Sequence, residues 1–149
     1  MFHNILVPVD IGEAEVAAEA IAAAVELAKA FDSNVRLIHV ASPIIPGSPM
    51  AVIPQSVYDE IGVNERSQLE AMAAAIELPS AKISTSVRIG GVYPELLAEA
   101  AQWPADLIVV GAHRRSMASY LLGSTSAAVS RHAACTVMIA RSSIRAKII

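Results

Sequence analysis

Cysteine is nearly absent from this chain of 149 residues, in which Cys135 stands alone. A single cysteine excludes an internal disulfide framework and fits a reducing compartment. His132 lies three residues before Cys135, but no second pair of ligands accompanies them, so we predict no metal site there. The neighbours of Cys135 are apolar, and we interpret it as a small buried hydrophobic residue.

The motifs of common nucleotide-using and hydrolytic enzymes are also missing. The sequence has no GxxxxGK(S/T) P-loop, no GxGxxG after its first apolar run and no GxSxG elbow. It has no paired-carboxylate motif and no full histidine and cysteine cluster at metal spacing. We therefore predict no catalytic residues and no metal ligands. If the protein binds a nucleotide, any hydrolysis should be slow.

An excess of one charge is absent as well. The chain has 11 basic and 14 acidic residues, a net charge of −3, and the two signs are interspersed. Without a clustered basic face, we expect no nucleic-acid partner. The N-terminal stretch MFHNILVPVD has no basic region, so we expect no signal peptide and a cytoplasmic protein.

The sequence is apolar overall, and residues 37–58 contain no Asp, Glu, Lys or Arg. That length could span a bilayer. The stretch is interrupted, however, by Pro43, Pro46, Gly47, Pro49 and Pro54. Prolines remove backbone donors and break helices, so we expect no membrane span.

What the sequence does contain is a regular alternation of apolar runs and segments of helical period. We predict strands at Asn4–Val9, Asn34–Val40, Ser84–Ile89, Asp106–Gly111 and Thr136–Arg141. We predict helices at Glu13–Ala30, Ser56–Leu78, Pro94–Gln102 and Ser124–His132. In the first helix, the face expected toward the core holds Ala17, Ile21, Ala24, Val25 and Ala28. This order predicts an α/β, Rossmann-like fold: an open parallel five-stranded sheet with helices on both faces. We expect one domain over residues 1–142, followed by a tail at 143–149.

Ligands bind such sheets beyond the carboxyl ends of the strands, where the strand order reverses. Gly123, Ser124 and Thr125 open the last predicted helix, whose free N–H groups could bind phosphate. The same residue types are favoured as helix caps, and both interpretations stay open. Arg114 and Arg115 lie in the preceding loop, where guanidinium groups could contact phosphate oxygens or simply face solvent.

The ends of the first two strands add further candidates. Asp10 could accept from a ribose hydroxyl, approach a metal, or cap the helix that starts near Glu13. The backbone of Val40 could pair with a base edge, whereas we interpret the His39 side chain as part of the core. His113 lies in the candidate loop, and we favour a structural over a catalytic role for it.

Four stretches together resemble the universal stress protein family: VPVD, the glycine loop after the fourth strand, LLGS and RHAACTVMIAR. The similarity runs from Asn4 to Arg141. It implies a single α/β domain of the adenine nucleotide alpha hydrolase-like kind, usually a dimer. The nucleotide-binding branch carries G-x2-G-x9-G-(S/T) and holds ATP between the first and fourth strands.

The resemblance implies that Gly111 lies by the ribose, Asp10 near the ribose and base, and Val40 at the adenine. Gly123, Ser124 and Thr125 would then meet the phosphates. The full nucleotide-binding set expected is Pro8, Val9, Asp10, Val40, Gly111, His113, Arg114, Arg115, Gly123, Ser124 and Thr125.

This chain departs from the family pattern in the loop. Arg114 replaces the second glycine, and eight residues rather than nine separate it from Gly123. The departure favours the branch that lacks nucleotide. The stretch HRRSMASYLLGST is nevertheless similar to an ATP-binding subgroup with a His-Arg loop and a shortened turn. In that subgroup an arginine would supply a charged donor in place of a backbone one.

We therefore expect an ATP-binding, stress-responsive regulatory protein, with or without Mg²⁺, and at most a weak ATPase. The alternative is a dimeric interaction module without nucleotide. In either case Thr136–Arg141 would be an edge strand able to pair with a second copy, giving a homodimer or a tetramer. A ligase or nucleotidyl transferase is disfavoured, because DIGEAE after the first strand lacks a glycine-rich pyrophosphate loop.

Overall fold

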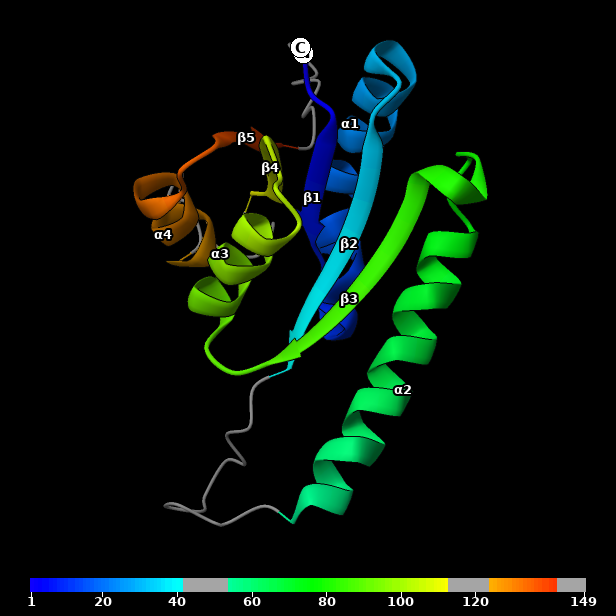
Figure 1. Cartoon of the computed structure of the whole chain (residues 1–149), viewed down its shortest axis with the longest axis vertical. Helices are drawn as coiled ribbons and strands as arrows, with labels where there is room; N and C mark the ends of the chain where they lie inside the picture. Colours follow the sequence, from blue (N-terminus) through cyan, green and yellow to red (C-terminus); the bar gives the residue numbers. More distant parts are fainter. Residues whose placement is uncertain (42–53, 113–123, 142–149) are drawn as a thin grey trace, which may run out of the picture.

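The computed structural model describes residues 1–41, 54–112 and 124–141. Five strands form one sheet in which every pairing is parallel, as predicted. Figure 1 shows this sheet with helices on either side of it. The strands are β1 (Asn4–Pro8), β2 (Asn34–Ala41), β3 (Ile83–Ile89), β4 (Leu107–Gly111) and β5 (Thr136–Ala140).

The strand order in space is β3-β2-β1-β4-β5, so the chain leaves the central strand β1 toward both edges. Ile5, Leu6 and Val7 of β1 are fully buried, which is the pattern of a strand covered on both faces. The predicted position of the last strand at an edge is confirmed, since β5 pairs with β4 alone.

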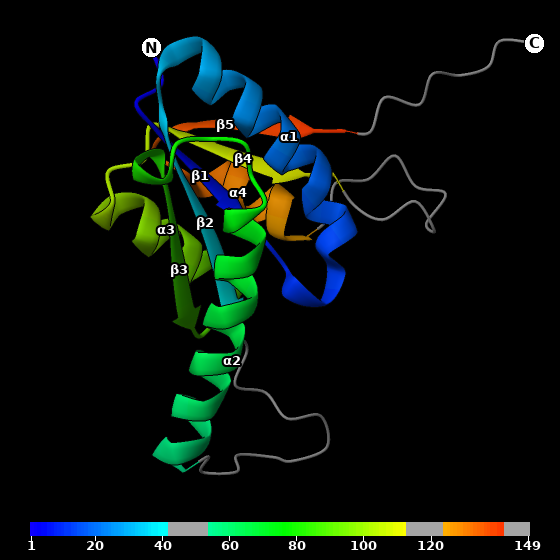
Figure 2. The ribbon, with the colours of Figure 1, turned by 90° about the vertical axis from the view of Figure 1, so that its right-hand side faces the viewer.

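Two helical layers cover the sheet (Figure 2). The elements between the strands are η1 (Ile11–Glu13), α1 (Ala14–Phe31), α2 (Gln55–Ala74), η2 (Ser80–Lys82), α3 (Val92–Gln102) and α4 (Ser124–His132). One core cluster joins α1 and α2 to one face of the sheet, and a second joins α3 and α4 to the other. Cys135, predicted as a small buried hydrophobic residue, packs against the second cluster and is half-buried. Burial raises the pKa of its thiol.

A ridge of alanines seats α1 on the sheet. Its buried residues are Ala17, Ala20, Ala24 and Ala28. The predicted core-facing position is confirmed for Ile21, which is half-buried and packs against the core cluster under α1 and α2. Val25 is half-buried and, together with Ile21, lines a groove between α1 and α2. The small ridge lets the helix axis approach the strands closely, so larger residues fit only at its flanks.

The helix α2 ends at Ala74 rather than at Leu78 as predicted. Pro79 disfavours the helical conformation at Leu78, the residue before it. Ile76 and Leu78 instead pack against the core cluster under α1 and α2. Among the helices of residues 1–41, 54–112 and 124–141, none is long and apolar enough to cross a bilayer.

A buried ion network links α3 to β2 and to the edge strand β3. Glu99 is 5% exposed, and its two carboxylate oxygens accept from Arg36 at 2.7 Å and Arg88 at 2.9 Å. Arg88 also binds Glu95 at 2.7 Å, and the Arg36 guanidinium lies 4.5 Å from the centre of the Trp103 ring. Burial alone would raise the pKa of Glu99, but hydrogen bonds from Arg36, Arg88 and Ser86 lower it below its ordinary value. The carboxylate is therefore held ionised in the folded state.

Replacing this carboxylate should cost stability in a pH-dependent way. We expect Glu99→Gln to lower the free energy of unfolding by about 1–3 kcal/mol at neutral pH, because both arginines lose a charged acceptor. The wild-type contribution is present above the unfolded pKa of Glu and is lost as the pH falls through the lowered folded pKa, below about pH 4.5. Urea unfolding at neutral and acid pH measures both effects. The control is Glu26→Gln, at an exposed position of α1, and an equal loss in both variants would contradict the network's role.

Candidate functional site

The sheet reverses its strand order at β1, which pairs with β2 on one side and β4 on the other. Ligands of open α/β sheets bind beyond the carboxyl ends of the strands at this point. We use the name switch-point edge for the carboxyl ends of β2, β1 and β4. The sequence-predicted residues Val40, Pro8, Val9, Asp10 and Gly111 all lie there.

The backbone of Val40 points toward the β1 side of β2. Ile38 O accepts from Val9 N at 2.8 Å, whereas Ala41 O accepts from Gly90 N after β3, so backbone groups alternate between the two neighbours. The backbone groups of Val40 therefore face β1, as those of Ile38 do. Because β1 ends at Pro8, opposite Ile38, no β1 residue pairs with Val40 in the strand register. Its N–H and C=O face a position where a planar base edge could add hydrogen bonds.

Asp10 acts as a cap. Its Oδ1 accepts from Gly12 N at 2.9 Å at the start of η1, and its carbonyl accepts from Glu13 N at 3.0 Å. The capping interpretation of Asp10 is thus confirmed for the turn that leads into α1. The side chain is exposed, and contact with a ribose hydroxyl stays a prediction.

His39 has more contacts than its predicted core role required. The residue is 8% exposed, and its Nδ1 lies 2.9 Å from Val9 O and 3.4 Å from Ile11 N. Its Nε2 lies 3.1 Å from Glu65 Oε2 on α2. The ring therefore joins β2 to the turn after β1 and to α2. A histidine in the otherwise apolar run LIHV was the signal in the sequence, but its partner on α2 was not predictable from spacing.

Gly111 ends β4 directly beneath the first turn of α1. A Cβ built on it would lie 2.4 Å from the carbonyl oxygen of Val16, which leaves no room for a side chain. Ser126 Oγ donates to Gly111 O at 3.0 Å, so the first turns of α1 and α4 are both held against the end of β4. Ser126 is buried and was not among the predicted site residues.

The predicted phosphate-binding segment is only partly described. Ser124 is exposed and Thr125 half-buried, and both lie in the first turn of α4, which begins at the residue predicted. His113, Arg114, Arg115 and Gly123 lie outside the described residues. The helix start and the Ser126 anchor place the first turn of α4 at the switch-point edge.

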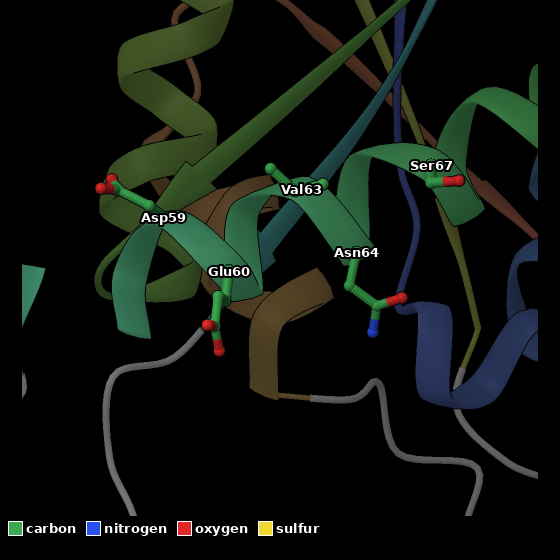
Figure 3. A pocket seen from close by; sticks show the side chains of 5 residues that line it. All are labelled: Asp59, Glu60, Val63, Asn64 and Ser67. Atoms are coloured by element: carbon green, nitrogen blue, oxygen red, sulfur yellow. The ribbon is translucent and has the colours of Figure 1, made fainter. Parts of the chain in front are cut away.

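A further pocket lies along α2, lined by Asp59, Glu60, Val63, Asn64 and Ser67. Figure 3 shows the side chains of Glu60 and Asn64 projecting to the same side of the helix. No motif or spacing in the sequence points to these residues. Two of the five are acidic, so this wall would repel a polyphosphate. In the three described ranges, no group of His, Cys, Asp or Glu could hold a metal ion.

The parallel sheet and the strand reversal at β1 define an α/β protein of the Rossmann-like type. The model of the universal stress protein family matches residues 1–141, and the chain belongs to that family. It is 31% identical to universal stress protein G of Salmonella typhimurium over 147 residues, which covers 95% of this chain and 100% of the relative.

Solved structures agree with this assignment. The universal stress protein UspA from Lactobacillus plantarum is 26% identical, with a TM-score of 0.73 over 93% of this chain and 97% of that one. A family member from Arabidopsis thaliana, solved with AMP bound, is 18% identical, with a TM-score of 0.60 over 93% of this chain and 91% of that one. At 18% identity the second likeness shows the fold alone.

The close contact at Gly111 can be tested by adding one methyl group. We expect Gly111→Ala to lower the free energy of unfolding by about 1–3 kcal/mol, because the Val16 carbonyl must move. The control is Gly62→Ala in α2, where an added Cβ meets nothing within 4 Å. That variant should be neutral or gain up to about 1 kcal/mol in helix propensity. Urea unfolding compares the two, and a Gly111→Ala protein as stable as wild type would refute the contact.

Proposed function

We propose that the protein is a cytoplasmic regulatory protein that binds ATP at the switch-point edge and hydrolyses it slowly or not at all. The observation that carries this proposal is the backbone of Val40, which faces the β1 side of the sheet beyond the last paired residue of β1. The turn capped by Asp10 and the first turn of α4, held at the end of β4 by Ser126, lie at the same edge of the sheet. The AMP found in the Arabidopsis thaliana relative supports an adenine nucleotide as the ligand.

The proposed nucleotide lies across the switch-point edge. Val40 would bind the adenine through its backbone, with Pro8 and Val9 beside the base, and Asp10 and Gly111 would contact the ribose. The phosphates would lie at the start of α4. The residues proposed there are Ser124, Thr125 and Gly123, with His113, Arg114 and Arg115 from the preceding loop.

The start of α4 suits an anion because its first N–H groups have no partner within the helix and the helix dipole is positive there. Arg114 would supply charge in place of the glycine backbone donor that the family pattern has. Any Mg²⁺ would reach the site bound to the triphosphate, since the described residues form no metal cluster.

Purified protein should carry the ligand. We expect denatured protein to release an adenine nucleotide, identified by chromatography and mass spectrometry, and calorimetry to show ATP binding. Gly123→Val should abolish both, because a branched side chain would cover the N–H groups of the helix start. The matched control is Gly62→Val on α2, where the added Cβ has open space. Protein that releases no nucleotide and binds none at millimolar ATP would end the proposal.

The edge strand β5 favours a second candidate function, a dimeric interaction module of the same family. Ala140 O accepts from Ala112 N at 2.8 Å, so the backbone of Ala140 faces β4. The alternation along the strand then turns the backbone groups of Val137 and Ile139 outward. These groups can pair antiparallel with the same strand of a second copy. Nucleotide binding and dimerisation are compatible, so dimerisation alone does not exclude ATP.

A proline at an outward position of β5 tests the pairing with a second copy and leaves the hydrogen bonds between β4 and β5 intact. We expect wild type to sediment as a dimer or a tetramer, and Ile139→Pro to shift it toward monomer, because one outward N–H is lost. Analytical ultracentrifugation measures the assembly, and circular dichroism checks that the variant is folded. A folded Ile139→Pro protein with unchanged sedimentation would place the interface elsewhere.

A further inference from the structure

The ring of His39 lies between the turn after β1 and helix α2. Two oxygen acceptors face its two nitrogens: Val9 O lies 2.9 Å from Nδ1, and Glu65 Oε2 lies 3.1 Å from Nε2. The His39 side chain is 11% exposed and that of Glu65 is 24% exposed, so water competes little for these contacts. Each contact is a hydrogen bond only where a proton lies between the two atoms.

A neutral ring cannot satisfy both acceptors. With its proton on Nδ1, the bare Nε2 faces an ionised carboxylate; with its proton on Nε2, the bare Nδ1 faces the Val9 carbonyl. In the second case Nδ1 can accept only from Ile11 N, at 3.4 Å. Both short contacts form together when the pair holds one further proton, as an imidazolium beside a carboxylate.

We propose that His39 and Glu65 form a proton-dependent clamp on the turn after β1, and that this clamp positions the turn for nucleotide. The inference rests on the nucleotide function proposed above. With the further proton, the ring holds Val9 O. Without it, the ring exchanges that partner for Ile11 N or releases Glu65. Val9 and Ile11 flank Asp10, the proposed ribose contact, so the proton count of the ring sets the position of that carboxylate.

Within residues 1–41, 54–112 and 124–141, the ionisable groups nearest the ring come from α2 and from the turn after β1. In the strand register β3 places Val87 beside His39. The ionisable group in contact from α2 is Glu65. Asp10 and Glu13 lie on the turn itself, where Asp10 caps η1. Histidine side chains ordinarily change charge between about pH 5 and pH 8.

The substitution Glu65→Gln distinguishes a proton-dependent clamp from a contact that depends on side-chain shape alone. Glutamine has the shape of glutamate, but its amide can donate to Nε2. A neutral ring with its proton on Nδ1 is then satisfied at both nitrogens and still binds Val9 O. The variant should therefore keep the turn in place at every pH, without the further proton.

The experiment combines ring NMR and nucleotide binding. In wild type, ¹⁵N spectra should show both ring nitrogens of His39 protonated near neutral pH. The affinity for ATP should fall about tenfold from about pH 6 to about pH 9, the loss of one charged hydrogen bond. In Glu65→Gln the His39 ring should be neutral, and the affinity for ATP should not fall over this pH range. Titration of the ATP phosphates affects both proteins equally. The matched control is His132→Gln, at an exposed histidine, which should show the wild-type change of ATP affinity with pH.

Three outcomes would overturn the clamp. The first is a neutral His39 ring in wild type near neutral pH. The second is a wild-type affinity for ATP that does not change with pH, as expected for Glu65→Gln. The third is an affinity for ATP that falls with pH in Glu65→Gln as it does in wild type. Failure of the nucleotide function is distinguishable from these. If the protein binds no ATP at any pH, the nucleotide function and its coupling to the clamp are both excluded. The ring spectra are recorded without ligand, so they still show whether His39 and Glu65 hold the further proton.

Discussion

The contact between Gly111 and the carbonyl of Val16 is the constraint on which the arrangement of this protein depends. Because no side chain fits between β4 and the first turn of α1, the two elements meet backbone to backbone. The alanine ridge of α1 extends the same close packing along the sheet. Ser126 then ties α4 to the same glycine. The ends of β1 and β4 and the starts of α1 and α4 are thereby brought to one edge of the sheet.

Buried polar side chains reinforce that edge. Among the described residues the buried polar or charged set is Ser33, His39, Glu99 and Ser126, and no buried side-chain polar atom there lacks a partner. Glu99 stabilises the packing of α3 against β2 and β3. His39 and Ser126 instead hold backbone groups at the switch-point edge, one after β1 and one at the end of β4. An unsatisfied polar group would be costly in this interior, so these bonds fix the edge as well as stabilise the fold.

Local patterns predicted most of the architecture. The five strands were placed to within one residue at each end, and α4 at its observed bounds, because apolar runs and capping residues lie at those positions in the sequence. Periodicity predicted which face of α1 lies toward the sheet but not how deeply each side chain is buried. Ile21 and Val25 lie on the predicted face and are only half-buried. Glu65 and Ser126 were missed because their partners, His39 and Gly111, are distant in sequence and only the folded chain pairs them.

The central claim is that an adenine nucleotide binds at the switch-point edge. An amide NMR titration of the full chain with ATP tests it most directly. If the nucleotide binds there, the largest shifts will occur at Val40, in the turn of Ile11 and Gly12, and in the first turn of α4, with little change along β3 or at the C-terminal end of α2. No saturable shifts, or shifts confined to the pocket of Asp59 and Val63 on α2, would contradict it.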